Sequence, residues 1–248
     1  VKRVSYLSSA DSRAIASDAQ FHGNIITGNI EHTIVMGLDY QNAYTDNDSV
    51  SGPAGTLDLF SPVYGKVDNL PTAGDLIDAP SSKTYQTGLY IQDSMKIAQQ
   101  WIVSAALRRD KATTNPENGK SESQYATTGR LGLMYLFDSG VSPYASYSES
   151  FEPLLGYDAF GNAFVPKTGE QVEAGIKYQP AGTEHLLTAA VYHIVEQNRT
   201  TPFNAEQATD SKVISPNGQV QQGEVTVKGL ELEAQLAWQS VDVYASYA

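Results

Sequence analysis

The chain alternates apolar and polar residues with a period of two over segments of about ten residues, and this pattern limits the possible folds most strongly. In residues 230–238 the even positions hold Leu, Leu, Ala, Leu and Trp, whereas the odd positions hold Glu, Glu, Gln and Ala. Residues 171–178 show the same split, as do residues 33–40 with Val35 as an exception. Because side chains alternate between the two faces of a strand, these segments predict strands with one apolar and one polar face.

Short and long connections also alternate along the chain. Tight turns are expected at residues 28–29, 98–100, 138–140, 180–183 and 239–240. Long polar links are expected at residues 46–82, 114–121, 153–167 and 200–221. In bacterial outer-membrane barrels the periplasmic turns are short, the extracellular loops are long, and strands of about ten residues cross the membrane. The pattern therefore predicts an all-β fold, an antiparallel up-and-down transmembrane β-barrel.

The alternating segments number about eleven, and the last one, residues 241–248, is short. An open sheet edge in lipid would leave unpaired backbone N–H and C=O groups, each costing several kcal/mol. We therefore expect residues 1–248 to be part of a barrel domain whose closing strands lie elsewhere.

Composition excludes several classes of function. The chain holds 16 Lys and Arg against 28 Asp and Glu without a basic cluster, which argues against a nucleic-acid partner. It has no cysteine, and its four histidines, His22, His32, His185 and His193, lack the spacing of a metal site. The sequence shows neither a Gly-x-Ser-x-Gly motif nor an identifiable pair of catalytic carboxylates. We therefore expect neither an enzyme nor a metal site.

Five collinear runs resemble the ferrichrome-type TonB-dependent siderophore receptors. The most specific is residues 129–153, which contain an Asp-Ser-Gly turn and end in Tyr-Ser-Glu-Ser-Phe-Glu-Pro. The others are residues 27–40, 86–93, 167–178 and 223–234. Two positions depart from the resemblance, since Arg109 stands where similar receptors often have an aromatic residue and Val172 where Tyr is frequent.

The resemblance implies a 22-stranded barrel in the bacterial outer membrane, filled by an N-terminal plug domain, of which this chain would supply about eleven strands. It implies TonB-dependent uptake of a ferric siderophore, most similar to the hydroxamate type. Because the siderophore coordinates the iron, no cofactor held by protein ligands is expected. The implied partners are the siderophore, outer-membrane lipid and lipopolysaccharide, the plug domain, and TonB through an N-terminal region outside these residues.

The aromatic residues divide into two groups by position. One group lies beside the tight turns, where an aromatic girdle would meet the periplasmic headgroups: Trp101, Tyr135, Phe137, Tyr178 and Trp238. The other lies on the long-loop side and comprises the candidates for siderophore binding: Tyr40, Tyr44, Phe60, Tyr64, Phe151, Tyr157, Phe160 and Phe164. Aromatic rings offer apolar area to an organic chelate; the alternative is that they pack the loops or form the outer girdle.

A set of charged residues is expected on the polar strand faces, toward the barrel interior. The candidates for contact with a plug domain are Arg108, Arg130, Glu173, Lys177, Glu231 and Glu233. The alternative is that they line a wet barrel wall.

Two other functions stay open at this point. One is a passive porin, or a barrel that docks phages or colicins, without energised uptake. The second is a soluble β-sandwich adhesin, although long strands with apolar outer faces suit it poorly. A plug and a TonB-recognition segment upstream would favour transport over both.

Overall fold

The computed structural model describes residues 1–65, 70–78, 81–117, 120–154, 156–203, 213, 218–238 and 240–248. These residues form thirteen strands and one short 3-10 helix. The strands are β1 (Lys2–Thr27), β2 (Ile30–Thr56), β3 (Ile77–Asp78), β4 (Ser82–Ile97), β5 (Trp101–Pro116), β6 (Glu122–Tyr135), β7 (Val141–Glu152), β8 (Lys167–Tyr178), β9 (Leu186–Gln197), β10 (Thr200–Pro202), β11 (Gln219–Gln221), β12 (Glu224–Trp238) and β13 (Val241–Tyr247), and the helix η1 is Ala73–Asp75. None of the helical structure in this part of the chain is long and apolar enough to cross a membrane.

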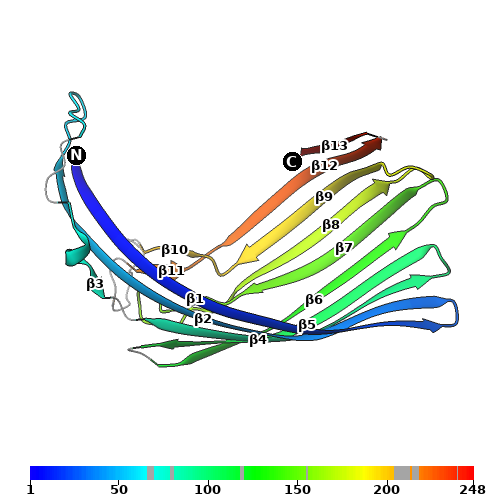
Figure 1. Ribbon diagram of the computed structural model, residues 1–248, viewed down its shortest axis with the longest axis horizontal. Helices are drawn as coiled ribbons and strands as arrows, with labels where there is room; N and C mark the ends of the chain where they lie inside the picture. The colour runs from blue at the N-terminus through cyan, green and yellow to red at the C-terminus, as the bar shows by residue number, and fades with distance from the viewer. Residues whose placement is uncertain are drawn as a thin grey trace. The chain divides into compact units, whose positions relative to one another are not determined.

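Within the described residues, eleven strands form one sheet in the order β1-β2-β4-β5-β6-β7-β8-β9-β12-β13, with β3 paired to β2 (Figure 1). Strands β10 and β11 form a separate two-stranded sheet. The long strands follow one another in chain order, and the ladders from β6 to β13 are antiparallel. The expectation of an antiparallel up-and-down sheet of about eleven strands is confirmed.

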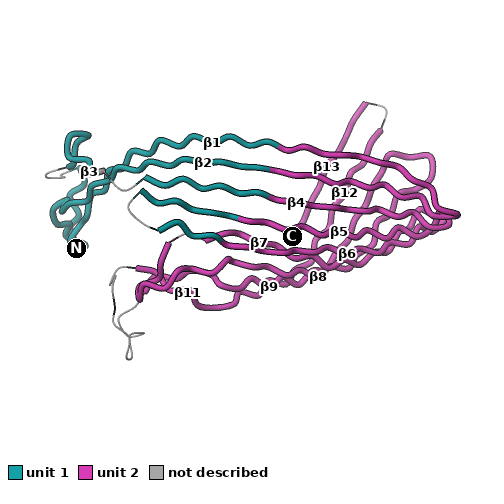
Figure 2. The backbone as a smooth tube through the Cα atoms, turned by 90° about the horizontal axis from the view of Figure 1, so that it is seen from below, with its two compact units in different colours: residues 1–17, 40–87, 112–123 teal, residues 18–39, 88–111, 124–248 magenta. Residues whose placement is uncertain are grey.

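The chain divides into two compact units, coloured separately in Figure 2. Unit 1 comprises residues 1–17, 40–87 and 112–123, and unit 2 comprises residues 18–39, 88–111 and 124–248. In unit 1 the polar end of β2 is held by hydrogen bonds to the start of the chain. The Leu57 amide donates to the Val1 carbonyl at 2.8 Å, and the Ser5 hydroxyl donates to the Gly52 carbonyl at 3.0 Å.

The expected start of two long links was wrong. Strand β2 continues to Thr56 instead of ending before Asp46, and β5 continues to Pro116 instead of ending before Thr114. Pairing with a neighbouring strand satisfies the backbone groups there, so a polar, non-alternating sequence still forms a strand. The link expected at residues 200–221 contains the paired strands β10 and β11.

The expected tight turns at residues 28–29, 98–100, 138–140 and 180–183 are confirmed, and Gln239 of the fifth lies outside the described residues. The turn between β4 and β5 is unusual because Ala98 and Gln99 both have positive φ, 49° and 63°. Its Gln100 amide donates to the Ile97 carbonyl at 3.2 Å. Two positive φ values are the signature of a type I′ hairpin turn, which usually contains glycine.

In unit 2 the pairing of residues between neighbouring strands shows which side chains share a face of the sheet. Glu173 lies opposite Ser146 on one side and Tyr192 on the other, and directly opposed residues point to the same face. One residue along, Val172 lies opposite Tyr147. Val172 is 57% exposed, as befits a side chain that has lipid rather than protein beside it.

On the polar face, three tyrosine rings each cover a glycine of the adjacent strand. The pairs are Tyr90 with Gly37, Tyr144 with Gly175, and Tyr192 with Gly229. A Cβ atom added to Gly175 would stand 2.7 Å from a carbon of the Tyr144 ring. The rings shield backbone that glycine would otherwise leave bare, an arrangement known as aromatic rescue.

Candidate functional site

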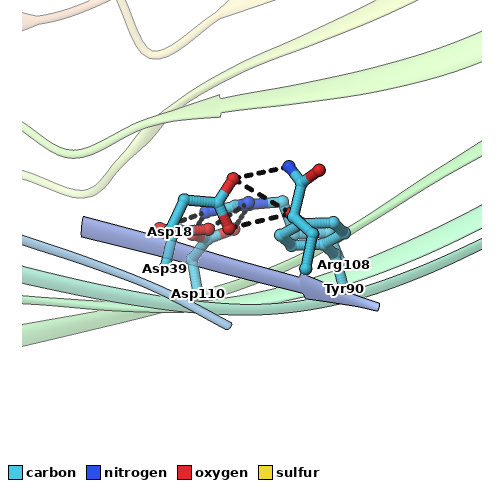
Figure 3. Close-up of polar contacts among 6 residues, drawn as sticks. Asp18, Asp39, Tyr90, Arg108 and Asp110 are labelled. Atoms are coloured by element: carbon cyan, nitrogen blue, oxygen red, sulfur yellow. Dashed lines mark hydrogen bonds and ion pairs between the residues drawn. The ribbon is translucent and has the colours of Figure 1, made fainter. Parts of the chain in front are cut away.

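Arg108 is the centre of a polar cluster on unit 2 (Figure 3). Its guanidinium donates to Asp39 of β2 at 2.6 and 3.1 Å and to Asp110 of its own strand at 2.6 and 2.8 Å. Bidentate pairing of this kind uses the planar donor geometry of arginine. Asp110 is only 3% exposed, so the guanidinium compensates a buried charge.

The cluster continues onto β1 and β4. The Tyr90 hydroxyl donates to Asp18 at 3.0 and 3.2 Å, and Arg108 lies 5.6 Å from the centre of the Tyr90 ring (Figure 3). The Gln20 side chain donates to the same Asp18 carboxylate at 2.6 Å. Four strands are therefore joined by side chains on one face. Asp39 and Asp110 contact the guanidinium directly, and a third carboxylate, Asp18, is joined to the cluster through the Tyr90 hydroxyl.

A second polar group surrounds Glu173 on β8. The Tyr144 hydroxyl donates to this carboxylate at 2.7 Å and Gln171 donates to it at 2.8 Å. Lys177 lies 5.6 Å from the centre of the Tyr144 ring. These residues line a hollow of about 520 Å³, together with Arg130 and others from β4 to β7.

The six charged residues expected on the polar face all lie there. Arg130 aligns with Ser148 and Gln171. Glu231 lies opposite Ala190, which in turn lies opposite Gly175, and Glu233 lies opposite Thr188, which in turn lies opposite Lys177. Arg108 shares its face with Ser104 and Ala106, which line the same hollow as Glu173.

The eight aromatic candidates are not brought together in one place. Tyr40 follows Asp39 in β2, so strand alternation puts its side chain on the face of the sheet away from the Arg108 cluster. Phe151, next to Glu152 at the end of β7, shares the face of Tyr147. In unit 1, the Tyr44 hydroxyl donates to Asp46 at 3.3 Å. Phe60 and Tyr64, which follow β2, are 99% and 78% exposed.

The remaining candidates lie in the loop after β7. The Phe160 ring packs against Phe203, with 5.5 Å between ring centres, and the Phe164 amide donates to the Gly156 carbonyl. Phe160 and Phe164 are half-buried, whereas Tyr157 is 48% exposed. The Phe160 ring and the Phe164 backbone therefore support the loop, whereas Tyr157 faces solvent.

Hydrogen bonds fix the shape of this loop. The Asp158 carboxylate accepts from the backbone amides of Phe160 and Asn162 at 2.9 and 2.7 Å. Gln124 donates to the carbonyls of Leu154 and Phe164 at 2.7 and 2.8 Å. Desolvation acts to raise the pKa of Asp158, but the hydrogen bonds from Asn162 and Phe160 outweigh it and hold the pKa below its ordinary value.

A similar arrangement begins η1 in unit 1. The Asp75 carboxylate accepts from the backbone amide and the hydroxyl of Thr72, both at 2.8 Å. These two hydrogen bonds lower the pKa of Asp75.

Sequence reasoning missed Asp18, Asp39, Tyr90 and Asp110. Alternation does place Arg108 and Asp110 on one face. Their pairing with β2 depends on a register between distant strands, which the residue pattern leaves open. Within the described ranges, no group of three His, Asp or Glu residues is arranged to hold a metal ion.

Strands with an apolar and a polar face, joined alternately by tight turns and long loops, define the wall of an up-and-down barrel that crosses the outer membrane. Residues 3–248 match the TonB dependent receptor-like, beta-barrel family, and the chain belongs to this family. The resemblance found in the sequence, and with it the location in the bacterial outer membrane, is confirmed.

Two relatives illustrate the likeness. The chain is 36% identical over 226 residues to the Ferrioxamine B receptor of Salmonella typhimurium (strain LT2), a match that covers 89% of this chain and 30% of the relative. It is 33% identical over 247 residues to the Ferrichrome outer membrane transporter/phage receptor of Escherichia coli (strain K12), covering 93% and 31%. The chain thus spans about a third of the length of these relatives.

Solved structures show the same fold. The ferripyoverdine receptor of the outer membrane of Pseudomonas aeruginosa, bound to ferripyoverdine, matches with a TM-score of 0.77 and 17% identity, covering 97% of this chain and 33% of the receptor. BauA, the ferric preacinetobactin receptor from Acinetobacter baumannii, matches with a TM-score of 0.73 and 19% identity, covering 97% and 36%.

Proposed function

We propose that the full-length protein that carries this chain takes up a ferric siderophore across the outer membrane with energy from TonB. The observation that carries the proposal is the 36% identity to a ferrioxamine B receptor over 89% of this chain. A ferrichrome transporter is a second relative at 33% identity. Since both relatives are named for hydroxamate siderophores, we propose a cargo of this type. The relatives are receptors and transporters, and no covalent chemistry enters the proposal.

In this proposal the siderophore coordinates the iron and the protein binds the organic chelate. The loop aromatics that are open to solvent, Phe60, Tyr64 and Tyr157, supply apolar area, and the tyrosines add hydroxyl groups. Tyr44 contributes from within β2. Phe160 and Phe164 act indirectly, because they hold the loop after β7 in shape.

The polar face would contact a plug domain that fills the barrel interior. Arg108 and Lys177 already pack on tyrosine rings, and the Arg108 cluster includes the three carboxylates of Asp18, Asp39 and Asp110. The wall around it would therefore favour cationic side chains of the plug. The candidates for this contact are Arg108, Arg130, Glu173, Lys177, Glu231 and Glu233. Ligand binding shifts such a plug only if the ligand binds its two states with different affinity.

A host that lacks its own siderophore receptors tests the proposal. We expect the full-length protein to restore growth on a ferric hydroxamate siderophore as the single iron source, and to fail when TonB is deleted. Uptake that continues without TonB would indicate a passive porin, and failure on every siderophore would reject the transport function.

Docking of phages or bacteriocins is a second function compatible with the same loops. The E. coli relative is named a phage receptor as well as a transporter. Phe60 and Tyr64 expose large rings that such a partner could bury. Killing of the complemented host by a phage or colicin, together with loss of TonB-dependent growth on siderophores, would favour docking as the principal function.

A further inference from the structure

The loop after β7 and the hairpin formed by β10 and β11 share a small apolar core in unit 2. Ala159 of the loop is fully buried and Val220 of β11 is 3% exposed, which makes them two of the five buried apolar side chains among the described residues. The Phe160 ring of the loop packs edge to face on Phe203, which follows β10. Because a two-stranded hairpin is only marginally stable in water by itself, this hairpin depends on the loop after β7 for its order.

Main-chain hydrogen bonds connect the same two segments. The Ala159 amide donates to the Gln219 carbonyl of β11 at 2.8 Å. In the hairpin, β10 and β11 are paired along their length, and the Phe203 amide donates to the Gly218 carbonyl at 2.9 Å. A buried backbone amide without a partner is costly. A movement of either segment away from the other would therefore break the backbone pairing of both.

The side chain of Gln221 in β11 pairs with the backbone at the base of both segments. Its Oε1 accepts from the Val165 amide at 2.8 Å, and its Nε2 donates to the carbonyls of Val165 at 2.5 Å and Asn198 at 2.8 Å. The Asn198 side chain, between β9 and β10, donates in turn to the Pro166 carbonyl at 2.9 Å. Since a glutamine amide has two donor hydrogens and an acceptor oxygen, Gln221 uses both donors and its acceptor to join the two segments.

A second glutamine, Gln124 of β6, fixes the loop after β7 to the barrel wall. Besides donating to two loop carbonyls, Gln124 accepts from the Leu154 amide at 3.2 Å. The loop is thus held to the wall by Gln124 and to the hairpin by Gln221. We call residues 156–166 together with β10 and β11 the two-loop platform.

We propose that Gln221 is a positioning residue for ligand binding, because it joins the two-loop platform into one preformed body that holds Tyr157 in place before the ferric chelate arrives. Tyr157 belongs to this platform, where its backbone is bridged to Ala163 and its side chain is 48% exposed. A loop that is ordered beforehand loses less conformational entropy when a ligand binds. The role in binding rests on the proposed siderophore function, whereas the joining of the two segments does not.

Hydrogen exchange in the ligand-free, detergent-solubilised full-length protein tests whether the platform is one body. Gln221→Ala removes three hydrogen bonds that reach both segments, so we expect the amides of residues 156–164 and of β10 and β11 to exchange about tenfold faster or more. Gln197→Ala is the matched control, since Gln197 donates to the Glu224 side chain at 3.3 Å, outside the platform. The control should exchange like the wild type. Faster exchange in β10 and β11 alone, or in neither segment, would overturn the proposal.

Binding of the ferric chelate ferrioxamine B to the same proteins tests the positioning role. We expect Gln221→Ala to bind it about tenfold more weakly than the wild type and the Gln197→Ala control. In the complex, the platform amides of Gln221→Ala should regain protection, whereas those of the wild type should be equally protected with and without the chelate. A purely structural role predicts no such ligand-dependent difference, and equal affinity of Gln221→Ala and the wild type would overturn the positioning role.

The two measurements also keep this proposal separate from the transport function. A wild type that does not bind ferrioxamine B would reject that cargo and the positioning role with it, while exchange in the free protein still decides whether the platform is one body. Heat-modifiable migration in electrophoresis verifies that each variant is folded. Should Gln221→Ala fail to fold, Gln221→Glu provides the same comparison, because a carboxylate of the same size lacks both donors.

Discussion

Arg108 shows how a single residue determines what its neighbours can be. Its guanidinium donates hydrogen bonds to two carboxylates and lies against the backbone of β4 at Gly88. A Cβ atom at Gly88 would stand 2.6 Å from the guanidinium carbon and 2.7 Å from a carboxylate oxygen of Asp39. Glycine is required at position 88 because the ion pair occupies the space of a Cβ atom, and not because the backbone has a positive φ.

Replacement of this glycine is therefore costly. We expect Gly88→Ala to lower the free energy of unfolding by about 1–3 kcal/mol, because the added methyl group displaces the ion pair. Gly132→Ala is the matched control, since its Cβ would meet nothing closer than 3.8 Å. The temperature at which the purified full-length barrel loses its heat-modifiable migration measures both. Equal temperatures for the two variants would contradict the role of Gly88.

Among the elements, the turn between β4 and β5 adopts its shape without glycine. Ala98 has a φ of 49°, a region that costs a residue with a Cβ roughly 1–2 kcal/mol. Asn tolerates this region better than Ala. We expect Ala98→Asn to raise the unfolding free energy by about 0.5–1 kcal/mol, measured by urea-dependent unfolding in detergent. A lower unfolding midpoint would show that the turn has no strain to relieve.

The loop after β7 depends on an ionised carboxylate. Because its hydrogen bonds lower the pKa of Asp158, ionisation contributes stability that is complete above the ordinary Asp range and is lost as the pH falls through the folded-state pKa. We expect the amides of Phe160 and Asn162 to lose hydrogen-exchange protection below about pH 4, after correction for intrinsic rates. In Asp158→Asn this pH dependence should vanish. Its persistence in the variant would assign it to another group.

At this scale the residue pattern predicts some features and leaves others undetermined. Alternation in residues 171–178 and 230–238 predicts the faces of β8 and β12, because lipid and water impose opposite requirements on adjacent residues. It does not predict the ends of β2 and β5, since strands outside the bilayer need only a pairing partner. The strands β10 and β11, of three residues each, are too short for a period to be recognised in the sequence.

For the whole molecule, the loop tyrosines are the decisive test of ligand binding. We expect simultaneous replacement of Tyr44, Tyr64 and Tyr157 by Ala to weaken ferric-siderophore binding about tenfold or more while the barrel still assembles. Tyr6→Ala, at an exposed tyrosine of β1, is the control. Quenching of intrinsic fluorescence by the ferric siderophore gives the affinity. An unchanged affinity in the folded triple variant would remove these residues from the site.

The candidate site could be predicted only in part. Charged residues such as Glu173 and Lys177 follow from strand faces, so their shared polar face is predictable from sequence. The packing of Phe160 on Phe203 is not, because it joins two loops without periodicity. The partners of Arg108 likewise depend on which strands become neighbours, a property of the whole sheet.

The tyrosines that cover glycines on the polar face constrain how the barrel can evolve. At Gly229 a new side chain would meet the Tyr192 ring, and at Gly175 it would meet both the Tyr144 ring and the backbone carbonyl oxygen of Ala189. Loss of the Tyr144 ring instead leaves only a gap that water or a new side chain can fill. Viable lineages should therefore lose the tyrosine before the glycine.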